Sequence, residues 1–169
     1  MRDRNVLYLI TAIGMSGWIL LFRKRGHFKD WLLIYLFKTL VSTLMDGPVI
    51  KRKFVQYPIR YMPKLFDSNI AFLYLIFPML CVMYNQFTYK MKPVKTFFSV
   101  FLFSVPMGLI EHLLEKKTNL VVFNKGWSAY HTISILTLTF WLVRLFICTV
   151  RMLDKKRGGG VEEGALEEY

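Results

Sequence analysis

The stretch PMGLIEHLLEKKTNLVVFNKGWSAYH, residues 106–131, joins two long apolar runs. It places Glu111, His112 and Glu115 where the first run ends, and His131 shortly after the second begins. Residues three or four positions apart are neighbours on a helix, so Glu115 is expected to reach both Glu111 and His112. This is the densest polar cluster in a hydrophobic sequence, which makes it the first candidate for a functional site.

The composition of the whole chain indicates a membrane protein. The 169 residues are 54% hydrophobic and 17% aromatic, and the apolar runs are nearly continuous, which disfavours a soluble helical bundle. The net charge of +12 comes from short basic clusters between these runs. Such clusters are typical of loops that flank membrane spans, so they predict attraction to anionic lipids and no binding of nucleic acid.

The run lengths predict an all-α fold, a polytopic membrane helix bundle with about five transmembrane helices. The expected spans are residues 6–22, 31–50, 70–87, 96–115 and 127–150. Together with their loops they form a single transmembrane domain, residues 1–157, followed by an acidic tail, 158–169, whose glycines indicate flexibility. Lys and Arg divide almost evenly between alternate loops, which leaves the orientation open.

Residues 51–69, between the second and third spans, are expected to be interfacial. Pro58 and Pro63 interrupt the segment too often for a span, yet it is too apolar for a plain solvated loop. We therefore expect it to lie on the membrane surface. Its aromatic anchors would be Phe54, Tyr57, Tyr61 and Phe66.

Small residues and prolines predict local features of the spans. Gly14 and Gly17 lie one turn apart in the first span, where they would let another helix approach closely. Pro78 is expected to kink the third span and to free the carbonyl of Tyr74, and Pro106 predicts a second kink in the fourth.

Ionisable residues inside the spans are the remaining site candidates. In the second span, Lys38, Ser42 and Asp46 follow one another at i+4 spacing along a stripe. Intramembrane charges are costly, which makes them functional candidates, although Lys38 could snorkel and Asp46 could lie at the interface. Five antiparallel spans would gather the acids and histidines in one leaflet, namely Asp46, Glu111, His112, Glu115 and His131. They would place the basic residues Lys38 and Arg144 toward the opposite leaflet.

Several short motifs also suggest a family. They are LYLITAIG..GW at residues 7–18, DWLL at 30–33, YP.R..PK at 57–64, PM.LIE...E.KTNL at 106–120 and KGW..YH at 125–131. In this order they resemble a family of small, uncharacterised multi-span membrane proteins of spore-forming Firmicutes. The resemblance implies a bacterial origin and an inner-membrane location, but no activity.

Three functional classes fit these residues. The first is a non-catalytic membrane component, either a partner subunit of another membrane protein or a homo-oligomer, in which buried polar groups hold helices together. The second is a small transporter or channel component with Asp46, Glu111 and His131 along a polar path. The third is a metal-dependent membrane enzyme.

The enzyme class has the least support in the sequence. Glu111 and His112 diverge around the helix axis, and Glu115 has two lysines beside it, so we expect no metal site and no cofactor. Cys81 and Cys148 lie in apolar runs without the spacing of a zinc motif. We predict instead a contact between Glu111 and His131, direct or through water or an ion.

Overall fold

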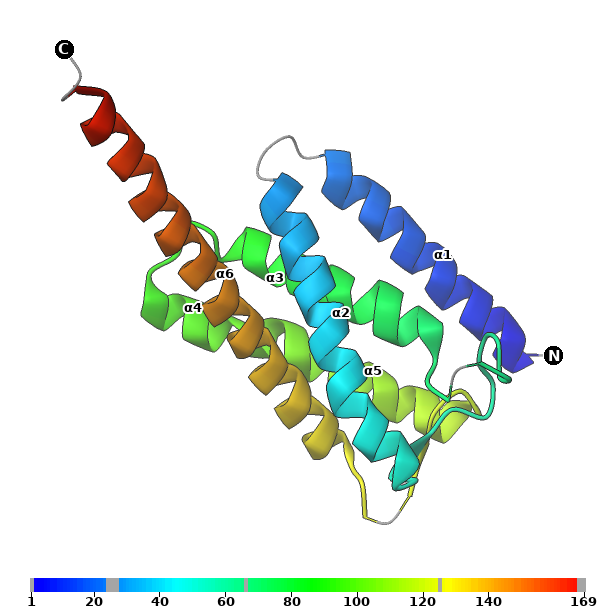
Figure 1. Ribbon diagram of the computed structural model, residues 1–169. Coiled ribbons are helices and arrows are strands. Elements are labelled where there is room, and N and C mark those ends of the chain that lie inside the picture. Colours follow the sequence, from blue (N-terminus) through cyan, green and yellow to red (C-terminus); the bar gives the residue numbers. More distant parts are fainter. Residues whose placement is uncertain (1, 24–27, 66, 125, 167–169) are drawn as a thin grey trace.

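The chain forms a bundle of long helices that run alternately up and down. The computed structural model describes residues 2–23, 28–65, 67–124 and 126–166. The helices are α1 (Arg2–Arg23), α2 (Phe28–Lys51), α3 (Phe77–Phe87), α4 (Pro93–Ser99), α5 (Phe101–Lys117) and α6 (Ala129–Leu166), and a π-helix, η1 (Ala71–Ile76), leads into α3. Figure 1 shows α2 and α6 beside each other, with α1 at one side of the bundle. The predicted all-α class is confirmed.

Four helical stretches among the described residues are long and apolar enough to cross a membrane. They are Asp3–Leu21, Phe28–Lys51, Pro93–Lys117 and Ala129–Lys156, the third combining α4 and α5. The stretch expected as the third span, residues 70–87, forms a shorter apolar helix, Ala71–Phe87. These lengths indicate a membrane-associated protein.

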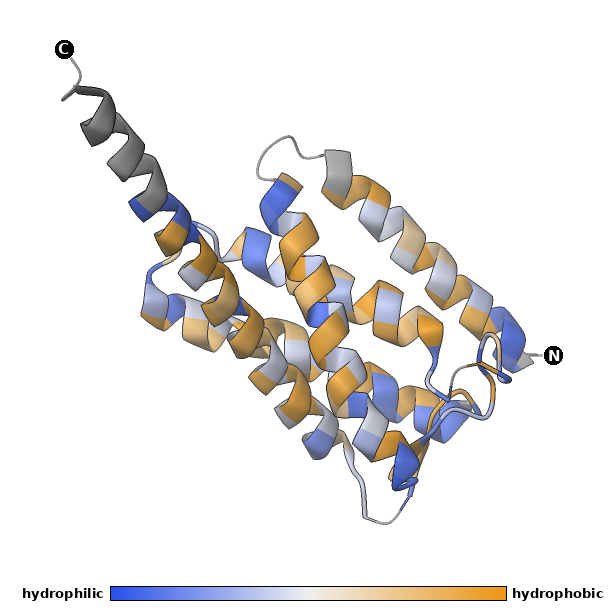
Figure 2. Cartoon of the chain, in the orientation of Figure 1, coloured by the Kyte–Doolittle hydropathy of each residue, from blue (hydrophilic) through white to orange (hydrophobic). Residues whose placement is uncertain are grey.

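The outward faces of the helices are strongly apolar. Figure 2 shows hydrophobic residues along the helices and hydrophilic ones gathered toward helix ends and connections. Large exposed side chains include Ile19, Leu44, Leu102 and Leu145, each more than 60% exposed. Water would disfavour so much exposed hydrocarbon, whereas lipid would not. The core lies inside this surface and includes Ile34, Phe72, Tyr84, Phe140 and Ile147.

The glycines of α1 pack as predicted. A Cβ atom on Gly14 would come within 2.6 Å of Leu75, and one on Gly17 would overlap Met79. The missing side chains therefore let α1 approach η1 and α3 closely. In the same contact the Trp18 indole Nε1 donates a hydrogen bond to the carbonyl of Leu75 at 3.1 Å.

The helix changes form where Pro78 predicted a kink. Residues 71–76 are π-helical, and the α-helix begins at Phe77 with the proline in its first turn. Proline lacks the backbone donor that would continue the ladder. The carbonyl expected to be freed was that of Tyr74. The Trp18 indole bonds the carbonyl of the next residue, Leu75.

The segment 51–69 packs on the protein itself. It contains strand β1 (Val55–Gln56), which pairs antiparallel with strand β2 (Val122–Phe123), with Val55 opposite Phe123. Val55 and Tyr57 are buried. The aromatic residues expected to anchor it in lipid are turned partly inward, and Phe66 lies outside the described residues. The sheet was not predicted, because two-residue strands carry no detectable alternation.

The end of the chain differs in part from the expected tail. The backbone of α6 continues to Leu166, through Gly158–Gly160. Residues 167–169 and the side chains after Lys156 lie outside the described part, so flexibility of residues 158–169 stays a prediction.

Candidate functional site

A small polar cavity lies inside the apolar bundle, between α2, α5 and α6. Its volume is about 50 Å³. Its polar lining includes Lys38, Ser42, Asp46, Glu111, Thr132 and Thr139. The stripe predicted on α2 thus faces the acid predicted on α5, at the end of the bundle that carries the β1–β2 sheet.

Lys38 is the basic member of this cavity and is only 2% exposed. Its Nζ donates a hydrogen bond to Ser42 Oγ at 2.6 Å. The same ammonium lies 5.7 Å from the ring centroid of Phe77 and 5.8 Å from that of Phe140, within the range of cation–π attraction. The side chain therefore extends toward Asp46, whereas the sequence placed Lys38 toward the opposite leaflet. A long, flexible stem lets a residue near the middle of a helix reach either way.

Glu111 is the buried acid, 4% exposed. Its carboxylate accepts a hydrogen bond from the Thr132 hydroxyl, which itself accepts one from Trp127 Nε1 at 3.3 Å. One turn before Glu111, a Cβ on Gly108 would overlap Ile133 of α6. The glycine thus lets α6 come close enough for Thr132 to reach the carboxylate.

Asp46 completes the ionisable group at the cavity and keeps partial exposure, unlike Lys38 and Glu111. It is therefore the member through which water has the readiest access to the cavity.

The loop after α2 covers this end of the cavity. Tyr57 is buried and lines it. Burial, with the nearby charges of Glu111 and Asp46, raises the pKa of Tyr57 well above its ordinary value, so the phenol stays neutral. Phe54 of the same loop stacks on Trp127 at 5.7 Å between ring centroids. The loop therefore also holds the indole that bonds Thr132.

The two histidines predicted as site residues, His112 and His131, lie outside the cavity. His131 is exposed, its Nδ1 lies 3.0 Å from Ser128 Oγ, and its ring stacks on Trp127. It does not line the cavity, and Glu111 bonds Thr132, the next residue, in its place. The His112 Nδ1 lies 3.6 Å from Glu115 Oε2, as the i,i+3 spacing predicted, but neither residue lines the cavity.

Metal-binding potential is low in the part of the chain that the structure describes. No group of three His, Cys, Asp or Glu side chains there converges in a way that could hold a metal ion. The polar cavity has two carboxylates, but its other polar lining is a lysine, hydroxyl groups and the Trp127 indole.

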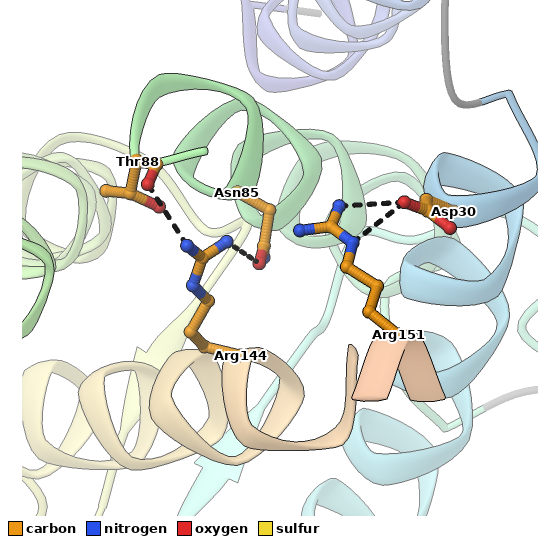
Figure 3. A network of polar contacts seen from close by, with 5 residues as sticks. All are labelled: Asp30, Asn85, Thr88, Arg144 and Arg151. Carbon is orange, nitrogen blue, oxygen red and sulfur yellow. Dashed lines mark hydrogen bonds and ion pairs between the residues drawn. The ribbon is translucent and has the colours of Figure 1, made fainter. Parts of the chain in front are cut away.

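A second polar network lies at the opposite end of the bundle (Figure 3). Arg144 donates from Nη1 to Asn85 Oδ1 at 3.3 Å and from Nη2 to the carbonyl of Thr88 at 3.0 Å. It thereby ties α6 to the carboxyl end of α3, where backbone carbonyls lack helical partners. Arg144 was predicted at this end, away from the acids.

An ion pair in the same network was missed in the sequence. Arg151 Nε donates to Asp30 Oδ2 at 2.8 Å, and Nη2 lies 2.8 Å from the same oxygen. The guanidinium also lies 4.7 Å from the ring centroid of Tyr89. Asp30 starts α2 and Arg151 lies late in α6, so the alternating direction of five spans would already have placed both at one end.

The hydroxyl-bearing face of α6 was also missed. Thr132 and Thr139 of α6 carry the hydroxyls, and Ser128, directly before the helix, and Ile135 continue the same i, i+4, i+7 and i+11 face. Thr132, Ile135 and Thr139 line the cavity. The spacing of these residues is visible in the sequence, but the prediction rested on His131, which lies on a different face of the helix.

Comparison with known proteins gives no family: no family model matches the chain, and no curated protein or solved structure matches it.

Proposed function

We propose that this chain is a five-span membrane protein that acts as a small transporter or channel component, with Lys38, Asp46 and Glu111 forming an intramembrane site for a proton or a small monovalent cation. The observation that carries the proposal is that these three ionisable side chains, from α2 and α5, line one cavity of about 50 Å³ in an apolar bundle. Ionisable groups at membrane depth are costly to keep and commonly mark ion pathways.

The five-span count is supported by the pairing of β1 with β2. Strand β1 follows α2, and β2 follows α5, so the intervening chain runs through α3 and then through α4 and α5. Paired strands lie at one face of the membrane, and a return to the same face takes an even number of crossings. This pairing therefore supports a crossing by residues 71–87 as well.

A crossing by residues 71–87 is physically reasonable. At the α-helical rise of ~1.5 Å per residue, this helix is at most about 25 Å long, short of a hydrocarbon core of ~30 Å. Local thinning of the bilayer accommodates such a mismatch at modest cost. Its short length explains why hydropathy and length alone leave it out of the candidate spans.

The chemistry of the cavity favours a proton or a hard, singly charged ion. With all three groups ionised, two carboxylates face one ammonium, which leaves one negative charge to be compensated. The remaining ligands are hydroxyl oxygens, which suit hard cations rather than the soft metals that prefer sulfur. The volume gives room for a few water molecules or one partly dehydrated cation.

The test is ion flux into liposomes that contain the purified protein. We expect proton or sodium uptake by the unaltered chain, and its loss in Glu111→Gln and Asp46→Asn, which keep the side-chain shapes but remove the charge. His131→Gln is the matched control, because His131 is exposed and outside the cavity. Flux that is unchanged in both acid variants refutes the proposal.

A second candidate is a non-catalytic membrane component or partner subunit. It is favoured by hydrogen bonds that link α5 to α6, from Thr132 to Glu111 and from Thr137 Oγ1 to Ser104 Oγ at 2.9 Å. Such contacts hold helices together in lipid. If the unaltered chain carries no flux and the acid variants lose only thermal stability, this second function is the better one. A bacterial inner-membrane location rests on the family resemblance and is proposed with either function.

A further inference from the structure

A large apolar groove lies at the end of the bundle opposite the polar cavity. Its volume is about 530 Å³, and it runs between the start of α4 and the later part of α6. Its lining includes Tyr84, Pro93, Phe97, Trp141, Leu145 and Cys148, with Arg144 as the charged member. The volume lies in the range of pockets that hold small organic ligands.

Two aromatic rings make one side of the groove rigid. Phe97 of α4 and Trp141 of α6 stack at 4.2 Å between ring centroids, nearly parallel. The Trp141 indole Nε1 also donates to the carbonyl of Phe97 at 3.2 Å. Leu145, one turn further along α6, is 70% exposed. The groove therefore presents a preformed hydrocarbon surface to the surrounding lipid.

Positive charge is concentrated where the chain enters α4. Lys90, Lys92 and Lys95 are all exposed, and they alternate with Met91 and Pro93, which line the groove. None of the three lysines forms an ion pair with an acidic side chain that the structure describes. Their charges are therefore available to a ligand that lies across the groove.

Arg144 adds a fixed charge to the groove. Its guanidinium is held by Asn85 and Thr88 (Figure 3), which use two of its donors. No carboxylate takes part in either of those two contacts, so the cation keeps its full positive charge. An apolar groove with one fixed positive charge and three exposed lysines beside it is complementary to an amphiphile with a negative headgroup.

We propose that this groove is a binding site for an anionic phospholipid, with one acyl chain along Phe97, Trp141 and Leu145 and the phosphate at Lys90, Lys92 and Lys95. The site is independent of the polar cavity and of the function proposed for it. The site would recognise both parts of the lipid. The apolar side chains of the groove favour an acyl chain, and the three lysines favour a negatively charged headgroup.

The experiment compares two lipids of identical acyl chains on the purified full-length protein in detergent. Phosphatidylglycerol is expected to raise the thermal unfolding midpoint more than phosphatidylcholine does. Native mass spectrometry is expected to show tighter binding of phosphatidylglycerol. Each lysine near an anionic headgroup contributes roughly a fivefold gain in affinity, so the Lys90→Gln, Lys92→Gln and Lys95→Gln triple variant should lose on the order of a hundredfold.

A matched control removes equal charge at the other end of the bundle. The triple variant with Gln at Lys51, Lys53 and Lys64, which are also exposed, should keep the preference for phosphatidylglycerol. Leu145→Trp, which fills the groove, should weaken binding of both lipids. The proposal is overturned if the unaltered protein treats the two lipids alike, if the control loses the preference equally, or if inorganic phosphate alone reproduces the thermal shift.

Discussion

At the scale of single residues, Lys38 and Glu111 show how this sequence accommodates ionisable side chains inside an apolar bundle. Lys38 bonds Ser42 of its own helix and lies between two aromatic rings. Glu111 is bonded by Thr132 from the neighbouring helix. A buried ionisable group without partners would cost several kcal/mol, so these contacts are what make the two side chains tolerable there.

Thr132 provides the first residue-scale prediction. Thr132→Val keeps the shape but removes the hydroxyl that accepts from Trp127 and donates to Glu111. We expect it to lower the free energy of unfolding by about 1–3 kcal/mol, because both partners would be left unsatisfied. Thermal unfolding in detergent measures this. Thr149→Val is the control, because its exposed hydroxyl bonds only the Leu145 carbonyl of its own helix. Equal losses in the two variants would contradict the role given to Thr132.

The acidic part of the cavity was predictable from the sequence, and its hydroxyl partner was not. Asp46 and Glu111 were placed together because antiparallel spans bring the ends of α2 and α5 to one face. The sequence predicts His131 as the partner of Glu111, because an imidazole can bond a carboxylate. In the structure, the His131 side chain points outward at the start of α6 and Thr132 points inward. Helix phase decides such a choice, and near a helix start a loop of unknown shape sets the phase.

At the scale of elements, the packing of α6 on α5 depends on Gly108. The glycine allows Ile133 to occupy the space where a side chain would be. The expected consequence of Gly108→Ala is a loss of about 1–3 kcal/mol of stability, together with weaker contact between Glu111 and Thr132. Gly47→Ala is the matched control, because a Cβ there meets nothing within 4 Å and alanine favours a helix. A thermal midpoint that falls as much in the control would show that the close approach is unimportant.

The loops between elements were the least predictable part. The interfacial position expected for residues 51–69 followed from their prolines and aromatic residues. In the structure, Val55 pairs with Phe123 and Tyr57 closes the polar cavity. The sequence of the segment does not predict this strand pairing, because the partner strand is far along the chain and only two residues long.

At the scale of the whole molecule, alternating helix direction explains how the polar groups are distributed. The ends of α2 and α5 and the start of α6 meet at one end with the acids and the sheet. The start of α2 and the later part of α6 meet at the other, where Arg151 pairs with Asp30. The alternating direction of the helices therefore sorts the ionisable residues into two networks.

Labelling of single cysteines tests this arrangement. In a background without native cysteines, the single variants Lys64→Cys and Asn119→Cys should be labelled from one side of the membrane. The variants Lys29→Cys and Lys92→Cys should be labelled from the other side. All four positions are exposed at helix ends or in loops. Labelling of Lys64 and Asn119 from opposite sides would mean that residues 71–87 do not cross.

If Lys38 and Glu111 belong to one charge-coupled site, as proposed, a double-mutant cycle will measure the coupling between them. Lys38→Met should strongly lower the thermal unfolding midpoint, because it leaves two carboxylates facing each other without a base. Adding Glu111→Gln to that variant should restore much of the loss, with a coupling energy of about 1–3 kcal/mol. Purely additive effects of the two substitutions would contradict this proposal.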